Sequence, residues 1–382
     1  MEQNDELSPG YKSPGYASLQ LHNGKEYTVR GLFGTGGFGD VYRVRDENGR
    51  QYAAKMFLRR SYNYSSDRER QAYERIAQNP HINLLSLHLA GQLINPPPGY
   101  ADEILITEAC GPSIKDIMMR ARADIGDAKL PTLPNYLHVF GMMRARGDIG
   151  DARSPSFSIN DIKQIGRQIG EALFHLEKLK IYHLDIKTNN VVFTTDVRYE
   201  VDPNLTHPII TMSDLQIKII DYGSSFFHSK PGIPRHPMIV QQQNLRAPEV
   251  FMGIPYDEKS DVWSMGCLMG EMYIGEPIFI FKLGTTETQK QQSQFEFMVS
   301  RMDATIPREL IDLSRQGRRC NLNLSFLENR EENNSNQDSL MNLLRENTDL
   351  AMFEFLKFIL IFNPADRPSF EEVIKHEFLT NF

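Results

Sequence analysis

The sequence IYHLDIKTNNVVF occupies residues 181–193, and its polar residues stand close together between two apolar ends. Asp185, Lys187 and Asn190 supply one carboxylate, one ammonium group and one amide. The apolar residues on either side can anchor both ends, which predicts a rigid polar loop. Because an Asp followed by a nearby Asn is also common in simple turns, the interpretation of this loop depends on the rest of the chain.

The length, charge and cysteine content set the class of protein. A chain of 382 residues is long enough for a two-lobed globular protein. Its net charge of -7 and pI near 5.9 argue against direct binding to nucleic acid or acidic lipid. The three cysteines are isolated from one another, which favours a reducing compartment. With neither a membrane span nor a signal peptide in the sequence, we expect a monomer of the cytoplasm or nucleus.

A glycine-rich pattern lies near the start of the chain. Gly34, Gly36 and Gly39 form G-x-G-x-x-G, and β-branched and aromatic residues follow at 41–44. Residues 51–57 read as another strand. The glycines therefore lie in a hairpin between two strands, not before a helix as in a dinucleotide site. Backbone amides in such a flap can approach phosphates closely because no Cβ intervenes.

Lys55 stands alone in the apolar run 52–57. Such a lysine can be an edge residue whose charge reaches solvent, but its place after a glycine flap favours pairing with nucleotide phosphates. The helix predicted at 67–78 offers a carboxylate to orient it. Glu69 lies on the apolar stripe of this helix, so we choose Glu69 and keep Glu74 as the alternative.

Residues 104–111 read as a buried strand that runs into a glycine-containing linker, where we place the boundary between the lobes. Backbone groups of this linker, at Glu108 and Cys110, could hydrogen-bond an adenine edge. The faces of the adenine would be covered by Val41, Ala53 and Val192.

A second carboxylate follows the strand predicted at 215–220. Asp221 is succeeded by an aromatic residue and a glycine, an arrangement suited to holding Mg²⁺ against phosphates. Asn190 is then the natural second ligand. Together with Asp185 and Lys187, these residues indicate phosphoryl transfer from ATP.

Two other segments stand out by composition. Residues 1–24 are polar and are predicted to be disordered, and their Ser-Pro pairs are either phosphorylation sites or inert. Residues 118–128 recur as 142–152, which indicates a duplicated insertion at 118–155. Two copies are too few for a solenoid, so this is a lengthened surface connection or a docking feature.

The order and spacing of these motifs resemble the eukaryotic protein kinase family over residues 25–382. The resemblance implies an α+β fold with a small β-rich lobe at 25–108 and a larger helical lobe at 112–382. It also implies that Asp185 orients the substrate hydroxyl and accepts its proton, while Lys187 stabilises the transferred phosphoryl group. Protein substrates, ATP and Mg²⁺ follow from the same resemblance.

The resemblance implies further roles for matched residues. Lys55 would hold the α and β phosphates, paired to Glu69. Glu249 and Arg367 match a structural ion pair of the large lobe, and Asp261 matches a residue that braces the catalytic loop.

Within the kinases, the chain is similar to the CMGC group and, more narrowly, to the LAMMER or CDC-like kinases. The polar insert at 194–214, after Phe193, and the D-Y-G-S-S run from Asp221 carry this similarity. That family phosphorylates Ser and often Tyr, acts on Arg/Ser-rich splicing factors and is largely nuclear.

The chain also departs from the family pattern. Leu184 replaces the usual arginine, which removes the main partner of a phosphate on the activation segment. Near the phosphoacceptor groove, a Thr, an Arg and a Tyr of the family are replaced by Gln242, Gln243 and Leu245. We therefore weigh an active Ser/Thr kinase, with Tyr as a further acceptor, against a kinase-like scaffold that binds ATP and a protein partner. A small-molecule kinase is disfavoured by the A-P-E motif at 247–249.

Overall fold

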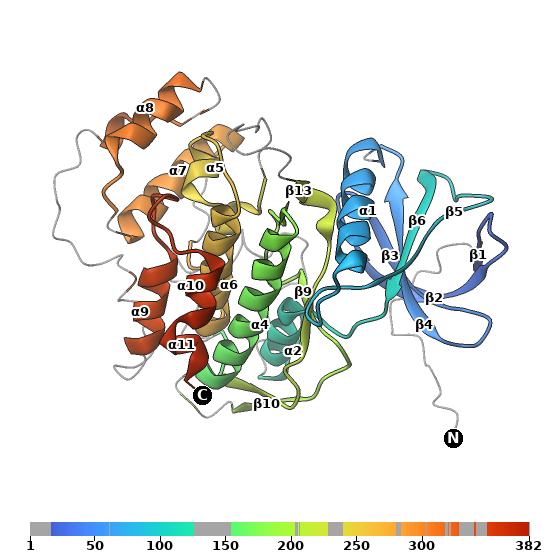
Figure 1. The fold of residues 1–382 in the computed structure, drawn as a ribbon. Helices are drawn as coiled ribbons and strands as arrows, with labels where there is room; N and C mark the ends of the chain where they lie inside the picture. The colour runs from blue at the N-terminus through green and yellow to red at the C-terminus, as the bar shows by residue number, and fades with distance from the viewer. Residues whose placement is uncertain are drawn as a thin grey trace.

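A computed structural model of the chain describes residues 17–60, 62–125, 154–202, 205, 207–227, 240–279, 284–302, 304–317, 320, 322–327, 340 and 350–381. Figure 1 shows two lobes, one a β-sheet with helix α1 and the other a mostly helical body. The predicted two-lobed α+β fold is therefore confirmed. In the described part of the chain, no helix is both long and apolar enough to cross a membrane.

The small lobe is an antiparallel sheet with the spatial order β1-β2-β3-β4-β6-β5. Its strands are β1 (Ser18–Gln20), β2 (Glu26–Thr35), β3 (Gly39–Arg45), β4 (Gln51–Leu58), β5 (Leu87–Gln92) and β6 (Tyr100–Glu108). Strands β2 and β3 form the predicted hairpin, and Gly36 N donates to Gly39 O at 2.8 Å across its turn. Helix α1 (Tyr62–Gln78) packs against the sheet and begins earlier than the predicted 67–78.

The end of the N-terminal tail differs from the prediction. Strand β1 pairs with β2, and both Leu19 and Leu21 are buried in the core of the small lobe. The prediction that a disordered tail extends to residue 24 is therefore wrong at its C-terminal end. Two alternating leucines are too short a pattern to predict a strand from sequence. Residues 1–16 lie outside the described residues.

The large lobe is built around α4 (Ile159–Lys178) and α6 (Lys259–Ile274), which pack against each other. Helix α4 buries one apolar stripe, whereas α6 is buried on all sides, as its uniformly apolar sequence predicts. Further helices are α2 (Ile114–Asp124), α5 (Pro248–Phe251), α7 (Glu287–Arg301), α8 (Arg308–Gln316), α9 (Leu350–Ile359), α10 (Phe370–Lys375) and α11 (Glu377–Thr380). Short 3₁₀ helices are η1 (Tyr222–Ser224), η2 (Gln243–Leu245) and η3 (Ser325–Leu327).

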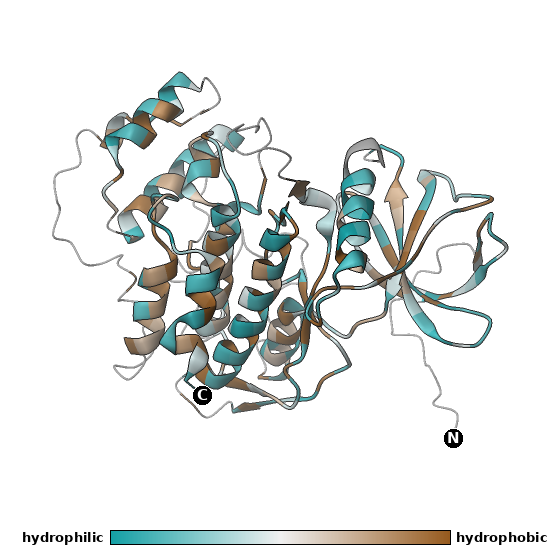
Figure 2. Cartoon of the chain, viewed as in Figure 1, coloured by the Kyte–Doolittle hydropathy of each residue, from teal (hydrophilic) through white to brown (hydrophobic). Residues whose placement is uncertain are grey.

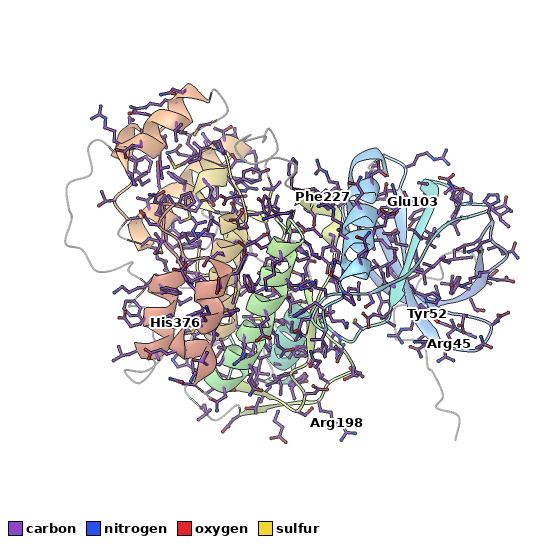
Figure 3. The ribbon with its side chains drawn as sticks, in the orientation of Figure 1. Arg45, Tyr52, Glu103, Arg198, Phe227 and His376 are labelled. Atoms are coloured by element: carbon purple, nitrogen blue, oxygen red, sulfur yellow. The ribbon has the colours of Figure 1, made fainter. Side chains whose placement is uncertain are left out.

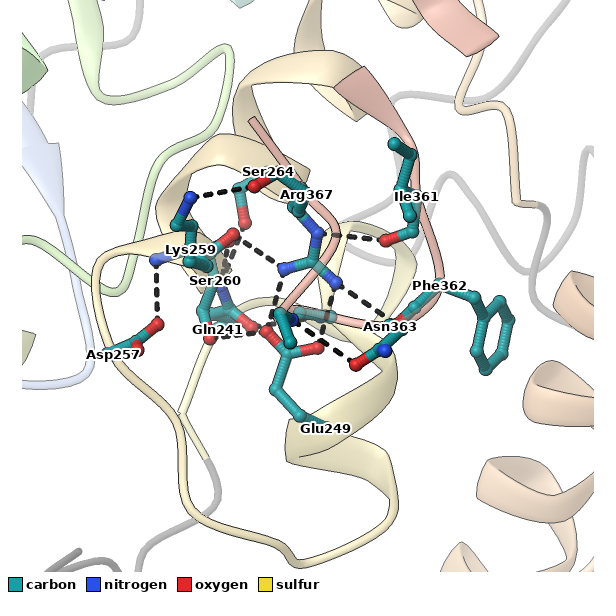
Figure 4. A network of polar contacts seen from close by, with 12 residues as sticks. Gln241, Glu249, Asp257, Lys259, Ser260, Ser264, Ile361, Phe362, Asn363 and Arg367 are labelled. Carbon is teal, nitrogen blue, oxygen red and sulfur yellow. Dashed lines mark hydrogen bonds and ion pairs between the residues drawn. The ribbon is translucent and has the colours of Figure 1, made fainter. Parts of the chain in front are cut away.

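Hydrophobic residues line the inner strands and helix faces, and hydrophilic residues line much of the outside (Figure 2). Within the large lobe, the predicted ion pair forms between Arg367 and Glu249, with Nη1 2.8 Å from Oε1 and both side chains fully buried (Figure 4). Loss of either partner would leave an uncompensated buried charge, which is strongly destabilising.

Short strand pairs frame the polar loop. Strand β8 (Ile181–Tyr182) pairs with β13 (Phe226–Phe227), and β9 (Val191–Phe193) pairs with β12 (Ile217–Ile219). The insert between β9 and β12, interpreted from sequence only as polar, forms β10 (Tyr199–Asp202) and β11 (Ile209–Met212). Strand β11 pairs with β7 (Ser156–Phe157). The first repeat copy begins inside α2, and residues 126–153 lie outside the described residues.

Helix α1 is fastened to the large lobe at its C-terminal half. The Arg75 guanidinium lies 4.4 Å from the ring centroid of Phe227, labelled in Figure 3, and donates to Leu179 O at 3.2 Å. Tyr73 packs edge-on against Tyr222, with ring centroids 5.1 Å apart. These contacts place α1, which carries Glu69, beside the residues that follow β12.

Candidate active site

The polar loop between β8 and β9 is braced from the core helix α6. Asp261 accepts the backbone N–H of His183 at 2.7 Å and that of Leu184 at 2.8 Å. Burial raises the pKa of Asp261 to about 7, although both N–H groups favour its ionised form. Leu184 is fully buried and has a φ of 58°, a left-handed conformation that a leucine adopts only when its surroundings enforce it. Asp261 therefore holds a strained turn immediately before Asp185.

Two functional groups of the loop converge on the carboxylate of Asp185. Lys187 Nζ lies 2.7 Å from Asp185 Oδ2. Asn190 donates its side-chain amide to Asp185 O at 2.9 Å and to Oδ2 at 3.1 Å. The structure thus brings together the residues predicted to orient a substrate hydroxyl and to stabilise the moving phosphoryl group.

Lys55 links both lobes. Its Nζ lies 2.7 Å from Glu69 Oε2 on α1 and 2.7 Å from Asp221 Oδ1 after β12. Burial alone would lower the pKa of Lys55, but the carboxylates of Asp221 and Glu69 hold it above its usual value. The alternative, Glu74, instead pairs with Arg70 on the helix surface at 2.7 Å. A cation positioned by two carboxylates is prepared to meet an anionic ligand.

Asp221 occupies a strained turn of its own. Its φ is 67°, and its Oδ1 accepts the N–H of Gly223 at 3.4 Å. Burial would raise its pKa, but Lys55 lowers it to about 2, so the carboxylate is ionised at neutral pH. A non-glycine residue in this conformation persists only where neighbours over-determine it, and such sites cluster where chemistry occurs.

The predicted metal ligands are brought next to each other. The pairing of β9 with β12 places Asn190 beside Ile220, whose N–H donates to Asn190 O at 2.9 Å, and Asp221 follows. Because the Asn190 amide hydrogens face Asp185, its side-chain oxygen is the atom left for a metal. An ionised carboxylate and an amide oxygen fit Mg²⁺, which takes few protein ligands and completes its shell with phosphates and water. Among the described residues, no cluster of three or more His, Cys, Asp or Glu could hold a metal alone.

The glycines of the flap differ in what they require. A Cβ at Gly39 would lie 2.2 Å from the Met56 carbonyl oxygen, so packing against β4 demands glycine there. At Gly34 a Cβ would meet nothing within 4 Å, and at Gly36 only the Gly39 oxygen at 3.4 Å. The glycines at 34 and 36 therefore need another explanation, and an approaching phosphate supplies one.

The linker between the lobes is strapped to β9. Gly111 N donates to Phe193 O at 2.8 Å, and Ser113 forms a bridge with Val192. Strand pairing sets Val41 opposite Lys55, and Ala53 opposite Thr107. In the part of the chain that the structure describes, the backbone of Cys110 makes no hydrogen bond.

The side chain of Glu108 has its own partners at the edge of this linker. Its Oε1 lies 3.0 Å from Lys218 Nζ and accepts the N–H of Ser86 at 2.7 Å. These contacts engage Oε1, and the Glu108 N–H donates to Ser86 O at 3.2 Å, so the backbone group of Glu108 that could bind an adenine edge is its carbonyl.

One supporting group was missed in the sequence. Glu271 is buried in α6, where its Oε1 accepts from Lys115 Nζ at 2.9 Å and lies 3.5 Å from Thr188 Oγ1 in the polar loop. A carboxylate in a helix that is apolar all round must have a partner. The single acidic residue in the apolar stretch 265–273 was therefore the feature of the sequence that could have identified Glu271.

The structure also describes two of the residues that replace family residues near the phosphoacceptor groove. Gln242 Nε2 donates to Asn244 Oδ1 at 2.8 Å, and Leu245 is buried. Among the described residues, the Asp185 carboxylate contacts Lys187 and Asn190 of its own loop.

Comparison with known proteins gives the same picture. Residues 135–379 match the family model described as "Protein kinase domain". Dual specificity protein kinase CLK4 of Mus musculus is 25% identical over 229 residues, which covers 58% of this chain and 45% of CLK4. Homeodomain-interacting protein kinase 4 of Mus musculus is 33% identical over 118 residues, which covers 31% of this chain and 17% of that protein. Both relatives are CMGC kinases, the group that the motifs indicated, although the chain spans less than half of either.

The structural comparison extends to the small lobe, where the family model does not reach. The crystal structure of a kinase domain aligns with a TM-score of 0.70 at 23% identity, covering 97% of this chain and 98% of that one. This similarity shows that both lobes share the fold of that domain.

Proposed function

The chain belongs to the protein kinase family, and we propose that it transfers the γ-phosphoryl group of ATP to hydroxyl groups of protein substrates. The observation that carries the proposal is the position of Lys55 Nζ, 2.7 Å from carboxylates of both lobes. A buried lysine with only a structural role needs one carboxylate to neutralise its charge. A second one, ionised and held in a strained turn beside Asn190, fits a site for phosphates and a divalent metal.

The reaction follows from the positions of the loop residues. Asp185 accepts the proton of the acceptor hydroxyl as that oxygen bonds to the γ-phosphorus and the bond to the β-phosphate oxygen breaks. Lys187, 2.7 Å from Asp185, offsets the negative charge on the transferred group. Lys55 would hold the α and β phosphates, and Asn190 and Asp221 would hold a divalent metal. Mg²⁺ bound there would neutralise phosphate charge and orient the leaving group.

The acceptor residue is the finer part of the proposal. The CLK relatives are named dual specificity kinases, which supports Ser and Thr as acceptors here, with Tyr in addition. Arg/Ser-rich proteins are the substrate class that the sequence resemblance implies.

This proposal is tested with purified protein, labelled ATP and peptide arrays that hold Ser, Thr and Tyr in Arg/Ser-rich and generic contexts. We expect label on Ser or Thr peptides with Mg²⁺ and none after chelation by EDTA. Phosphoamino-acid analysis decides whether Tyr is also labelled. Tight ATP binding without transfer to any peptide would instead support the ATP-binding scaffold.

A further inference from the structure

Gln241 lies in an unusual backbone conformation just before the A-P-E motif. It is buried and has a φ of 65°, in the left-handed region that non-glycine residues rarely adopt. Its N–H donates to Leu184 O at 3.2 Å, so it contacts the strained turn that precedes Asp185. A residue of the late activation segment is therefore joined directly to the catalytic loop.

The Gln241 side chain extends the junction in the other direction (Figure 4). Its Nε2 donates to Ser260 O and to Ser264 Oγ, both at 2.9 Å, at the start of α6. Its Oε1 accepts the N–H of Ala247 at 3.0 Å. The carbonyl of Gln241 in turn accepts from Arg246 Nη2 at 3.1 Å. All four polar groups of this glutamine are thus satisfied inside the protein.

These contacts add to others that join segment 240–247 and the catalytic loop to helix α6, among them the bonds of Asp261 to the loop. Ser264 Oγ donates to Leu245 O at 2.9 Å, and Ser260 Oγ donates to Glu249 Oε1 at 2.7 Å. The second contact continues into the buried pair of Glu249 with Arg367. The segment 240–247 is therefore fixed both to the rigid core helix and to the catalytic loop.

The side chain that forms this junction is a neutral amide. Its hydrogen bonds need no covalent modification, and Leu184 offers no guanidinium that a phosphate could use. A small side chain at 241 would leave the Ala247 N–H without its partner and remove both bonds to α6, which is unfavourable for buried groups.

We propose that Gln241 is a positioning residue that holds segment 240–247 against the catalytic loop, so that the acceptor side of the site is formed without activation-segment phosphorylation. The proposal rests on the proposed kinase function. Gln241 acts through Leu184 and Ala247 and takes no part in binding nucleotide. Its loss should therefore impair transfer to peptide far more than reactions that need only the nucleotide site.

The test compares Gln241→Ala with Gln294→Ala in the full chain. Gln294 is a matched control because it is equally buried in the same lobe, where its Nε2 donates to Phe279 O at 2.9 Å, away from the loop. We expect kcat/KM for peptide to fall at least about tenfold in Gln241→Ala. The affinity for ATP and the slow hydrolysis of ATP without peptide should each change less than about twofold. Gln294→Ala should leave all three quantities near wild type.

A second variant separates the hydrogen bonds from side-chain volume. Gln241→Glu keeps the size, but an ionised carboxylate cannot donate to Ser260 O. Its transfer rate, divided by the wild-type rate at each pH, should rise as pH falls and the carboxyl regains a proton. A ratio that is independent of pH, or parallel loss of ATP hydrolysis in Gln241→Ala, would overturn the proposal.

Amide hydrogen exchange supplies a readout that is independent of activity. The Ala247 N–H should exchange faster in Gln241→Ala and remain protected in Gln294→Ala. Unchanged protection in Gln241→Ala would refute the positioning role even in a protein that phosphorylates nothing. A wild-type protein without transfer to any peptide would instead refute the kinase function.

Discussion

At the residue scale, Lys55 shows how the role and the partner of one charged residue can be inferred from the sequence. In the sequence, the role of Lys55 was inferred from the glycine flap that precedes it. Its partner was inferred from the apolar stripe of one helix. In the structure Glu69 lies 2.7 Å from Lys55, whereas Glu74 faces Arg70 at the surface. The choice succeeded because helical periodicity alone tells which acidic residue faces inward.

A substitution at this pair tests its part in nucleotide binding. Glu69→Gln keeps the side-chain volume and removes the charge that orients Lys55. We expect the KM for ATP to rise about tenfold, equivalent to about 1.4 kcal/mol, because the ammonium is then drawn to Asp221 alone.

Steady-state kinetics at varied ATP measures this effect, with Glu74→Gln as the control on the same helix. Equal KM values in both variants would show that the Lys55–Glu69 pair has no part in binding ATP.

Other residue-level features could not be foreseen. The left-handed conformations of Leu184 and Gln241 are held by tertiary hydrogen bonds, and neither residue type favours a positive φ. Gln241 appeared in the sequence only as one of several consecutive amides. Three of its five hydrogen bonds are to residues that are distant along the chain, namely Leu184, Ser260 and Ser264.

At the scale of elements, long periodic segments can be inferred from the sequence, whereas short ones cannot. Helix α4 and the fully buried α6 follow from their apolar patterns. Strands β1, β10 and β11 were missed, because with three or four residues each is too short to show a clear alternating pattern. The region in which β10 and β11 form was interpreted only as a polar insert.

Strand β1 yields a prediction about stability. Leu21 is buried and bridges to Leu93, and a Cβ at Gly91 would lie 2.5 Å from Leu21 Cδ2, so the leucine fills its site tightly. Leu21→Ala should cost about 2–4 kcal/mol of unfolding free energy in the small lobe.

Urea unfolding followed by fluorescence or circular dichroism measures this loss, with the exposed Lys25→Ala as its control. An unfolding midpoint for Leu21→Ala equal to that of Lys25→Ala would mean that residues 17–21 are not part of the folded lobe.

At the scale of the whole molecule, the site is assembled from residues of both lobes. Helix α1 is fastened through Arg75 and Tyr73, and the catalytic loop is braced by Asp261. Leu184 is buried where the family carries an arginine, so a phosphate on the activation segment has no guanidinium at that position.

We therefore expect activity that does not depend on activation-segment phosphorylation. Phosphatase treatment should leave kcat/KM for peptide within about twofold, as should alanine at every serine from Ser224 to Ser229. Mass spectrometry of the treated protein establishes that the phosphate has been removed. Inactivation by phosphatase that rephosphorylation reverses would contradict this expectation.

The central claim is that Asp185 is the catalytic carboxylate of a protein kinase, and Asp185→Asn tests it most directly. With labelled ATP, Mg²⁺ and the best peptide from the arrays, single-turnover transfer should slow by about 10²–10⁴-fold, because Asn cannot accept the hydroxyl proton. ATP should bind as tightly as to wild type, since Lys55 and Asp221 are unchanged. Transfer at the wild-type rate in Asp185→Asn would contradict the account.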